Sequence, residues 1–356
     1  MIRSRLRFTR VEQPRFKRVT THDVAKRAGV SQPTVSLVLS RNANARVSSE
    51  TRERVLLAAR ELGYVTNVVA RSLVRSRSYA IGVIVPDLRN PFFADVISGA
   101  ERVASEAGYA VLLCETREIS RDRHIQTLLE RQVDGMMMDA VGAASLPEEM
   151  VAGVNVVLID EPADRWPGVA SDAIGAGQLA AEHLLELGHR RMGFLGPATN
   201  VHATRMRERG FIQALANHGV RVDSAMLRRV PATAGGGIAG MRALLDLDEP
   251  PTAVFCINDL VAAGALKVCS FEGIRVPEQM SIVGCDDIEL ATLLVPELTT
   301  IAIPARELGA RAARLLIQAL ENNPSDHRTP GRSRKTIASR LVVRGTTAAP
   351  RALDQL

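Results

Sequence analysis

The sequence predicts an α/β protein in which a small three-helix headpiece precedes two doubly wound lobes. Two observations support this fold class. Residues 20–62 contain three short segments of helical periodicity, whereas from residue 79 onward short apolar runs alternate with longer amphipathic segments. Continuous apolar runs are typical of parallel strands whose two faces are both covered by helices. A chain of 356 residues that is 46% hydrophobic is long enough for two or three such domains.

The first two helices are expected within residues 20–39, TTHDVAKRAGVSQPTVSLVL. Thr21 is the predicted hydroxyl cap of a helix that carries Val24, Ala25 and Ala28 on one stripe. Gly29 stands where this helix must end and reverse, a position that favours positive φ. Ser31 is then expected to cap the second helix.

A third helix completes the predicted headpiece, because two helices of this length are not stable alone. Ser48 is its expected cap, and Val55, Ala59 and Leu62 follow at helical spacing in residues 50–62. Three small helices with an uncharged, polar edge at the start of the second suit insertion into a DNA major groove. A three-helix module that contacts another protein is the alternative.

The segment DVAKRAGVSQPTVSLVLS resembles the DNA-binding segment of the LacI/GalR family of bacterial repressors. The resemblance covers residues 19–345 and continues, in the expected order, through ELGYVTNVVARSL, IGVIVPDLRNPFFADV, VDGMMM, EHLLELGHRRMGFLG, PTAVFCINDLVAAGAL, GIRVPEQMSIVGCDD and PELTTI. It implies a helix-turn-helix headpiece in residues 19–66, a hinge helix and linker in residues 67–78, and a two-lobed effector-binding unit of periplasmic-binding-protein type in residues 79–345.

The resemblance also implies which headpiece residues contact DNA. They are Thr21, Ser31, Gln32, Pro33, Thr34, Ser36 and Leu37. Leu37 departs from the family pattern, which often has arginine after T-V-S. An aliphatic side chain contacts a thymine methyl but cannot form a bidentate bond to guanine, so the operator should differ from well-known sites.

Residues 67–73, NVVARSL, form the expected hinge, and about eight residues are too few for a helix that is stable alone in water. The resemblance implies that two copies pair across a dimer and enter the minor groove through Asn67, Ala70, Arg71 and Leu73. Leu73 would be the wedge that separates the central base step. A plain linker with an incidental leucine is the alternative.

The remaining elements alternate in type along the chain. Strands are expected at 80–85, 110–113, 135–138, 154–159, 192–195, 227–230, 253–256, 281–283, 299–303 and 337–343, and helices at 92–107, 121–131, 173–187, 204–218, 237–245, 260–271 and 305–320. The first lobe should comprise residues 79–160 and 290–321, and the second lobe residues 161–289 and 322–345. Residues 346–356 form a short tail without leucine heptads, which favours a dimer over a tetramer.

Polar side chains follow several predicted strands, where a cleft between lobes would bind a ligand. Asp160, Asn258 and Asp286 come directly after apolar runs, and Arg207 can supply a forked donor. The resemblance places these four at effector-contacting positions, and Phe92 and Phe93 could cover an apolar sugar face. For each polar residue a helix cap or an ion pair is the alternative, and Asp259 is expected to be a cap.

This set favours a monosaccharide-like effector, or a sugar acid if Arg207 meets a carboxylate. A purine is less favoured because aromatic residues make up only 3% of the chain.

Two glycine-rich stretches resemble enzyme motifs. Residues 175–180, GAGQLA, fit a dinucleotide fingerprint, but small-residue packing against a sheet explains them better. Residues 235–240, GGGIAG, lack the Lys-Ser/Thr pair of a phosphate loop. No catalytic residue, metal ligand or cofactor is therefore expected, and the chain is not expected to be an enzyme.

The net charge of +6 suits a polyanionic partner. Residues 1–18 hold seven Lys/Arg against one acid, and they form either a basic DNA-contacting arm, a disordered extension or the result of a start codon placed too early. The four cysteines lack C-x-x-C spacing, and no apolar run approaches the roughly 20 residues that span a bilayer. These features indicate a cytoplasmic protein without membrane contact.

The sequence thus predicts a homodimeric transcriptional repressor that binds near-palindromic double-stranded operator DNA under the control of a small carbohydrate effector. The alternative is a periplasmic-type sugar-binding protein. That class would share the lobes, but it would need a signal segment and would lack residues 20–73.

Overall fold

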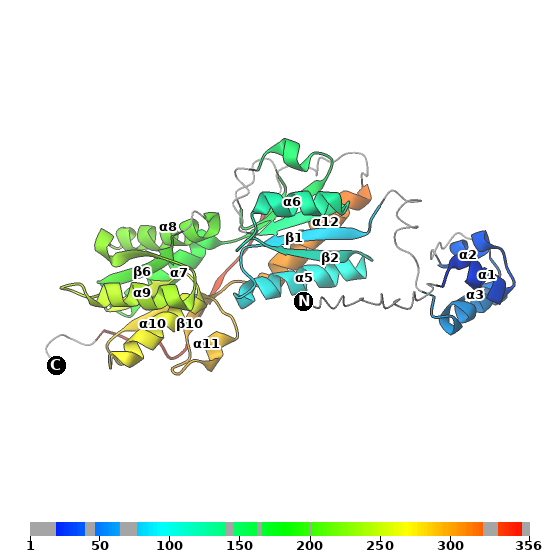
Figure 1. The fold of residues 1–356 in the computed structure, drawn as a ribbon. Coiled ribbons are helices and arrows are strands. Elements are labelled where there is room, and N and C mark those ends of the chain that lie inside the picture. The colour runs from blue at the N-terminus through cyan, green and yellow to red at the C-terminus, as the bar shows by residue number, and fades with distance from the viewer. Residues whose placement is uncertain are drawn as a thin grey trace, which may run out of the picture. The chain divides into compact units, whose positions relative to one another are not determined.

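The computed structural model describes residues 19–39, 47–64, 77–139, 146–161, 166–198, 201–322 and 334–350. The chain divides into two compact units, Met1–Ser76 and Arg77–Leu356 (Figure 1). Of the hinge helix and linker expected at residues 67–78, residues 67–76 lie outside the described residues, as do residues 1–18.

The headpiece consists of helices α1 (Thr21–Ala28), α2 (Gln32–Leu39) and α3 (Ser49–Glu61). Thr20, and not Thr21 as predicted, caps α1: its hydroxyl accepts a hydrogen bond from the Asp23 amide, and the Asp23 carboxylate accepts one from the Thr20 amide. This reciprocal capping box fixes the helix start one residue earlier. Gly29 ends α1 with φ 66°, as predicted.

The other two predicted caps, Ser31 and Ser48, are confirmed. The Ser31 hydroxyl accepts a hydrogen bond from the Thr34 amide at 3.4 Å, and the Ser48 hydroxyl accepts one from the Thr51 amide at 3.3 Å. Each helix contributes at least one valine to a common core: Val24 of α1, Val35 and Val38 of α2, and Val55 of α3 are buried. The headpiece therefore has a small apolar centre of its own, independent of the lobes.

The first lobe is built on a parallel sheet with the strand order β11-β5-β4-β3-β1-β2. Its elements are β1 (Ala80–Val85), α5 (Pro91–Glu106), β2 (Ala110–Glu115), α6 (Arg121–Glu130), β3 (Gly135–Asp139), η2 (Glu148–Val151), β4 (Asn155–Ile159), β5 (Gly168–Ser171), α12 (Ala305–Asn322) and β11 (Arg334–Ile337). Helices α5 and α12 pack together, and α6 packs against β1 and β2 (Figure 1).

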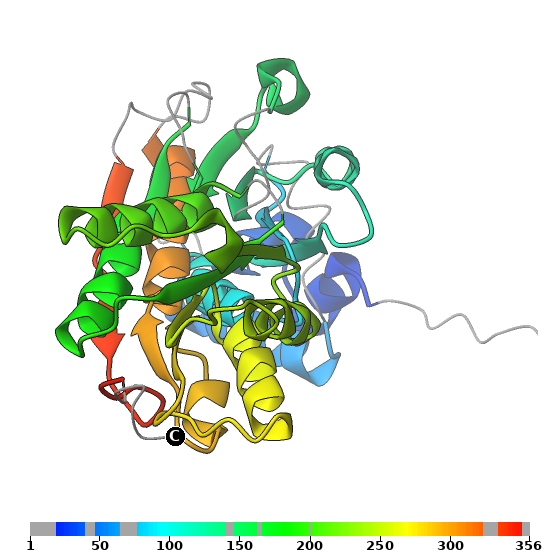
Figure 2. The same ribbon diagram turned by 90° about the vertical axis from the view of Figure 1, so that its left-hand side faces the viewer.

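The second lobe has the strand order β12-β10-β9-β8-β6-β7, parallel except for β12. Its elements are α7 (Ala173–Glu186), β6 (Met192–Pro197), α8 (His202–Asn217), η3 (Ser224–Met226), β7 (Leu227–Val230), α9 (Ala234–Leu245), β8 (Ala253–Cys256), α10 (Asp259–Phe271), β9 (Ser281–Asp286), α11 (Leu290–Leu293), β10 (Thr299–Ala302) and β12 (Arg340–Val342). Helices α7 and α8 pack as one pair and α9 and α10 as another, on opposite sides of the sheet (Figure 2).

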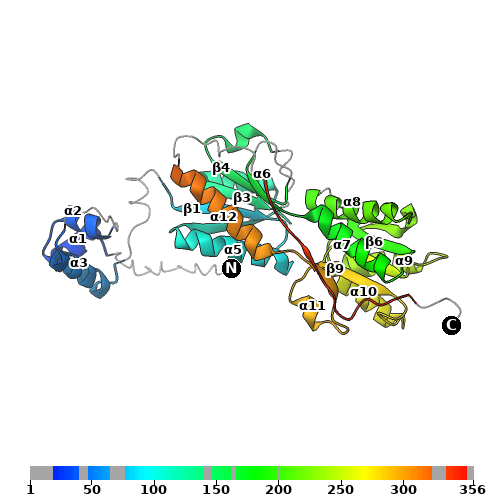
Figure 3. The same ribbon diagram turned by 180° about the vertical axis from the view of Figure 1, so that it is seen from behind.

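The predicted boundaries of the lobes are corrected by the sheet pairing. Strand β10 was expected in the first lobe, but it lies between β9 and β12 in the second sheet. The single strand predicted at residues 337–343 is two strands: β11 joins the first sheet and β12 the second, two residues later. The chain therefore crosses between the lobes again at this point (Figure 3).

Two further segments belong to a different lobe or element from the one expected. Strand β5 was not predicted, because its four residues, GVAS, are short and small, and it extends the first sheet beyond residue 160. Part of the expected tail is also packed: the buried Thr346 hydroxyl donates to the Ile282 carbonyl at 2.6 Å and accepts from the Thr299 amide at 2.9 Å. Residues up to 350 thus complete the second lobe.

The two glycine-rich stretches that resembled enzyme motifs are helix crossings. A Cβ at Gly177 of α7 would overlap the Arg207 carbonyl of α8, and a Cβ at Gly237 of α9 would overlap the Val261 carbonyl of α10. Each glycine lets two helix backbones approach more closely than any side chain permits. Small-residue packing, which the sequence favoured over a nucleotide site for residues 175–180, accounts for residues 235–240 as well.

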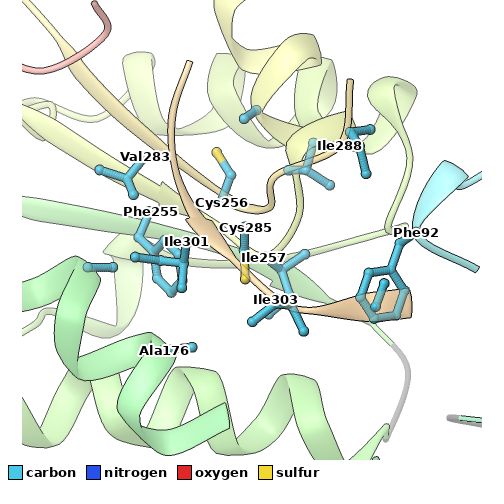
Figure 4. Close-up of a cluster of buried hydrophobic side chains, with 14 of the residues drawn as sticks. Phe92, Ala176, Phe255, Cys256, Ile257, Val283, Cys285, Ile288, Ile301 and Ile303 are labelled. Carbon is cyan, nitrogen blue, oxygen red and sulfur yellow. The ribbon is translucent and has the colours of Figure 1, made fainter. Parts of the chain in front are cut away.

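The largest apolar core extends from the second lobe into the first. Phe194, Phe211 and Phe255 pack with ring centroids 5.3 to 5.9 Å apart. Phe92 of α5 belongs to the same buried cluster as Ile303, beyond the end of β10 (Figure 4). All four cysteines are free, and three are buried in this region. No helix among the described residues is long and apolar enough to cross a membrane.

Substitution of Gly237 by alanine should lower the stability of the lobed unit by about 1–3 kcal/mol, because the added methyl group forces α9 away from the α10 backbone. A Cβ added at Gly235, two residues earlier in α9, would make only an ordinary contact with the Thr233 hydroxyl, at 3.7 Å. Gly235 therefore provides the matched control. Its replacement by alanine should leave stability unchanged or slightly higher. Urea unfolding of both variants measures the difference, and equal effects would contradict the close crossing.

Candidate functional site

A cavity of about 520 Å³ lies between the two lobes of the Arg77–Leu356 unit. All six side chains that the sequence singled out for a ligand line it, together with several neighbours. The lining includes Pro86, Asp87, Arg89, Asn90, Phe92, Phe93, Asp139, Asp160, Pro197, Val201, Ala203, Thr204, Arg207, Pro231, Ala232, Thr233, Ala234, Ile257, Asn258, Leu260 and Asp286. Because the carboxyl ends of parallel strands meet at one edge of each sheet, residues far apart in the chain converge here.

Arg207 is the buried cation of this cavity. The close crossing of α7 over α8 at Gly177 fixes the backbone of Arg207. One guanidinium nitrogen, Nη1, donates to the Ile257 carbonyl at 3.0 Å and to Asp286 Oδ1 at 3.2 Å, whereas Nε has no hydrogen-bond partner within the described residues. Arg207 is therefore held in place by one end of its fork and retains donor capacity toward the cavity.

Asp286 connects the two lobes. It ends β9 with φ 109°, a backbone conformation that a non-glycine residue rarely adopts. Its carboxylate accepts from Arg207 of its own lobe and from the Asn90 amide of the first lobe at 3.4 Å. Burial raises the pKa of Asp286 to about 6 even though the Arg207 guanidinium opposes the shift. A small change in the distance between the lobes would thus alter the surroundings of this carboxyl.

Asp160 follows β4 and is also in a left-handed conformation, with φ 53°. Its Oδ1 atom accepts from the Ser171 amide at 2.5 Å and from the Ser171 hydroxyl at 2.9 Å, while Oδ2 lies 3.1 Å from the same hydroxyl. The carboxylate is thus oriented by β5, the strand that the sequence did not predict.

Asn258 is the N-cap of α10, the alternative role that had been considered for it. Its side-chain oxygen accepts from the Val261 amide at 2.8 Å, and its nitrogen donates to the Ala232 carbonyl at 3.2 Å. The prediction that Asp259 is a cap was wrong. The Asp259 carboxylate instead accepts from the Thr300 hydroxyl at 2.6 Å and the Ile288 amide at 2.8 Å, and burial raises its pKa to about 8.

Phe92 and Phe93 lie at the start of α5, behind the cap Asn90 and Pro91. Their rings meet edge to face with centroids 5.3 Å apart. Phe92 is buried in the core, and Phe93 is only partly buried against it. Both line the cavity, with the more exposed Phe93 supplying the freer apolar surface.

Sequence reasoning missed Asp139, which lines the cavity at the end of β3. Its side chain is 1% exposed, and neither carboxylate oxygen has a hydrogen-bond partner within the described residues. The signal that identified Asp160, a carboxylate directly after an apolar strand, also applies to Asp139 after GMMM. Asn90 and the rim pair Asp87–Arg89 were likewise not singled out.

The headpiece presents the polar edge that the sequence predicted. Most of the expected DNA-contacting side chains there are exposed, and Thr21 and Thr34 are half-buried. The Gln32 side-chain amide donates to the Thr21 hydroxyl at 2.7 Å, which joins the starts of α1 and α2. Leu37 is 43% exposed and is not one of the residues that form the headpiece core. Asn67, Ala70, Arg71 and Leu73 lie outside the described residues.

Comparison with known proteins identifies both parts of the chain. Residues 20–67 match the family described as bacterial regulatory proteins, lacI family, and residues 181–347 match the periplasmic binding protein-like domain. The HTH-type transcriptional repressor CytR of Escherichia coli strain K12 is 36% identical over 338 residues, which cover 93% of this chain and 96% of that protein.

The chain belongs to the lacI family.

Solved structures agree with this membership. The lac repressor dimer bound to operator and the anti-inducer ONPF has a TM-score of 0.83 and 28% identity, with 94% of this chain and 100% of that chain covered. The transcriptional regulator CelR in complex with cellobiose has a TM-score of 0.70 and 31% identity, with 92% and 100% covered. This lacI-family chain is a DNA-binding transcriptional repressor and not an enzyme. The headpiece match excludes the alternative of a sugar-binding protein without a regulatory role.

Replacement of Asp259 by asparagine should change how the stability of the protein depends on pH. The folded-state pKa of about 8 lies above the ordinary carboxyl value of about 4, so this group's contribution to stability is present at low pH and is lost as pH rises through 8. The melting temperature of the wild type relative to the Asp259→Asn variant should therefore fall between pH 5 and pH 9. Asp248→Asn, at an exposed position, is the control. A difference that stays constant with pH would contradict the raised pKa.

Proposed function

We propose that this repressor releases or engages its operator in response to a small cytoplasmic sugar or sugar derivative bound between the lobes. The observation that carries the proposal is the cavity lined by Asp160, Arg207, Asn258 and Asp286, in a chain that also has a DNA-binding headpiece. A volume of about 520 Å³ is within the range of small-molecule sites and suits a mono- or disaccharide.

A carbohydrate fits the cavity chemistry better than an apolar or flat aromatic ligand. Carboxylate acceptors and the guanidinium donor of Arg207 face the same space, so several hydroxyls can be bound at once, and a ligand without them leaves buried groups unpaired. Phe93 supplies an apolar wall for the face of a sugar ring. The cellobiose bound by CelR, a structural neighbour of this chain, supports this ligand class.

The proposed signal is a change in lobe closure. The hydrogen bond from Asn90 to Asp286 joins the lobes across the cavity, and an effector hydroxyl that competes for Asp286 would weaken it. A ligand that favours one lobe arrangement over the other shifts the equilibrium by its difference in affinity. A hundredfold change in operator affinity needs only about 2.7 kcal/mol of such coupling.

We further propose that the protein acts as a homodimer on a near-palindromic operator. The lac repressor neighbour is described as a dimer bound to operator, which supports a two-fold arrangement of two headpieces. Among the described residues, large apolar side chains are exposed on both lobes. They include Leu113 on the edge strand β2 of the first lobe, and Phe271 and Leu293 in the second lobe. A partner subunit would cover such groups.

Residues 67–73 complete the proposal as the coupling element. In this scheme the segment is coil in the free protein and forms a helix when two copies lie in the minor groove, with Leu73 as the wedge. The effector acts by favouring or preventing this pairing. Whether the ligand induces or corepresses depends on which lobe arrangement it stabilises.

The first test is selection of bound sites from a random duplex library with the purified chain, followed by gel-shift titration. Binding should weaken as salt increases, with a log–log slope near −0.9 for each phosphate contact. Leu73→Ala should weaken operator affinity while the affinity for a bound sugar is retained, because the wedge touches DNA only. A slope near zero would exclude specific duplex binding, and unchanged operator affinity in the variant would remove the wedge.

The second test is Arg207→Ala. This variant should bind operator but lose its response to a pool of neutral mono- and disaccharides, since the cavity loses its buried donor. Arg229→Ala is the matched control, because Arg229 also pairs with a carboxylate, Glu208, in the same lobe but does not line the cavity. A normal sugar response in Arg207→Ala would mean that the effector binds elsewhere.

A further inference from the structure

Ser171 is a buried residue that lies outside the cavity and holds one of its carboxylates. It is the last residue of β5, is 4% exposed and does not line the cavity. Its amide donates to Asp160 Oδ1 at 2.5 Å, and its hydroxyl lies 2.9 Å from Oδ1 and 3.1 Å from Oδ2. Among the described residues, Ser171 is the hydrogen-bond donor to this carboxylate.

The Asp160 carboxylate continues the hydrogen bonding between β4 and β5 beyond the end of β4. The two strands pair in parallel through Leu158 and Ile159, and the Asp160 amide still donates to the Val169 carbonyl at 3.0 Å. The chain then turns, because Asp160 has φ 53°, and its side chain accepts from the Ser171 amide. A side chain of the cavity therefore takes part in holding the end of β5.

The chain crosses from the first lobe to the second directly after Ser171. Only Asp172 separates the end of β5 from Ala173, the first residue of α7. The Asp172 amide donates at 2.9 Å to the carbonyl of Ile337, the last residue of β11, and the Asp172 carbonyl accepts from the Ser339 hydroxyl at 3.3 Å. Ser339 belongs to the connection between β11 and β12, which is a second crossing between the lobes. The two crossings are thus bonded to each other, next to Ser171.

Asp172 also fixes the start of α7. Its carboxylate accepts from the Gly175 amide at 2.9 Å. Helix α7 in turn crosses α8 at Gly177, where a Cβ would overlap the carbonyl of Arg207, the buried cation of the cavity. A displacement of Asp172 would therefore be passed through α7 to the part of the cavity that the second lobe provides.

A ligand hydroxyl that binds Asp160 would compete with Ser171. The Ser171 hydroxyl has one hydrogen and lies within reach of both carboxylate oxygens. A ligand that donates to one oxygen directs this hydrogen to the other oxygen or takes its place. The bonds that Ser171 makes should therefore differ between the empty and the occupied cavity.

We propose, on the basis of the effector-controlled repression proposed above, that Ser171 is a positioning residue that couples the occupancy of the cavity to the two crossings between the lobes. It acts through Asp160 on one side and Asp172 on the other. Coupling between distant sites requires an element whose arrangement both sites influence. The bonded crossings are such an element, because the cavity acts on them through Ser171 and both lobes act on them through the chain.

Two variants distinguish this role from a contribution to stability. Ser171→Ala removes the hydroxyl and keeps the amide that holds Asp160 Oδ1. Ser281→Ala is the matched control, because Ser281 is also buried and its hydroxyl donates to the Ala348 carbonyl at 3.1 Å, but it does not line the cavity. Both variants lose a hydrogen bond of a buried hydroxyl, so an effect of stability alone should appear in both.

The first experiment needs no ligand. Hydrogen exchange is measured by mass spectrometry on the full-length wild type and both variants. Peptides that cover residues 168–176 should exchange several-fold faster in Ser171→Ala than in the wild type, because the bond from the Asp172 amide to Ile337 opens more often. In Ser281→Ala the exchange of these peptides should be unchanged. Equal exchange in the wild type and Ser171→Ala overturns the proposal, as does an equal increase in both variants.

The second experiment separates the affinity for a sugar from the response to it. The probes are ribose, cellobiose, glucose and galactose. Calorimetry gives the affinity of each full-length protein for the sugar, and fluorescence anisotropy gives its affinity for the selected operator with and without that sugar. In Ser171→Ala the sugar affinity should remain close to the wild-type value, because the amide bond to Asp160 is retained. The factor by which the sugar changes operator affinity should move toward one by roughly threefold or more.

The outcomes separate the two proposals. A sugar response in Ser171→Ala equal to that of the wild type overturns the coupling role, as does an equal loss of response in Ser281→Ala. A loss of sugar affinity that accounts for the whole loss of response also overturns it, because Ser171 would then only support the binding site. If none of the four sugars binds the wild type, the carbohydrate function fails, and the exchange measurement decides whether Ser171 controls the crossings.

Discussion

The buried ion pair between Arg207 and Asp286 is the interaction on which the cavity depends. A single guanidinium is surrounded by carboxyls from three strand ends, and only one of them, Asp286, is bonded to it directly. Taking an unpaired charge out of water is expensive, so the remaining carboxyls must be neutralised or hydrogen-bonded in some other way. Ser171 does this for Asp160, while burial and the neighbouring carboxylates raise the pKa of Asp139 well above its ordinary value. The electrostatic character of the whole site follows from this shortage of positive charge.

The helix pairs give the site its rigidity. Where α7 crosses α8 and α9 crosses α10, the glycines allow backbone-to-backbone contact, so the helices cannot slide past one another without collision. Arg207 lies at one such crossing, and Asn258 caps the helix at the other. Polar groups fixed in this way have little conformational entropy left to lose on binding a ligand. The glycine-rich stretches thus serve recognition indirectly, through the positions of neighbouring side chains.

The sequence predicted most elements, and the six residues that it singled out for a ligand all line the cavity. For Asp160, Asn258 and Asp286 the reason is that a polar residue after an apolar run marks the carboxyl end of a parallel strand. Its errors have physical causes. Thr20 and Thr21 are chemically equivalent caps, and only the position of Asp23 decides between them. Strand β10 was assigned to the wrong lobe because periodicity reports burial but not the partner strand. Asp139 was overlooked although it obeys the same rule as Asp160. Asn258 and Asp259 are adjacent and both can cap a helix, and local spacing does not encode that Asn258 contacts the α10 amide while Asp259 contacts Thr300.

The connection between β11 and β12 spans only residues 338–339, yet it leads from the edge of one sheet to the edge of the other. Three extended Cα-to-Cα steps, from Ile337 to Arg340, reach roughly 10 Å, so the adjoining ends of these strands cannot separate by more than this distance. The lobes can rotate relative to one another about this short connection, but they cannot move apart at this point. A ligand in the cavity would consequently change the angle between the lobes rather than the separation of these strand ends.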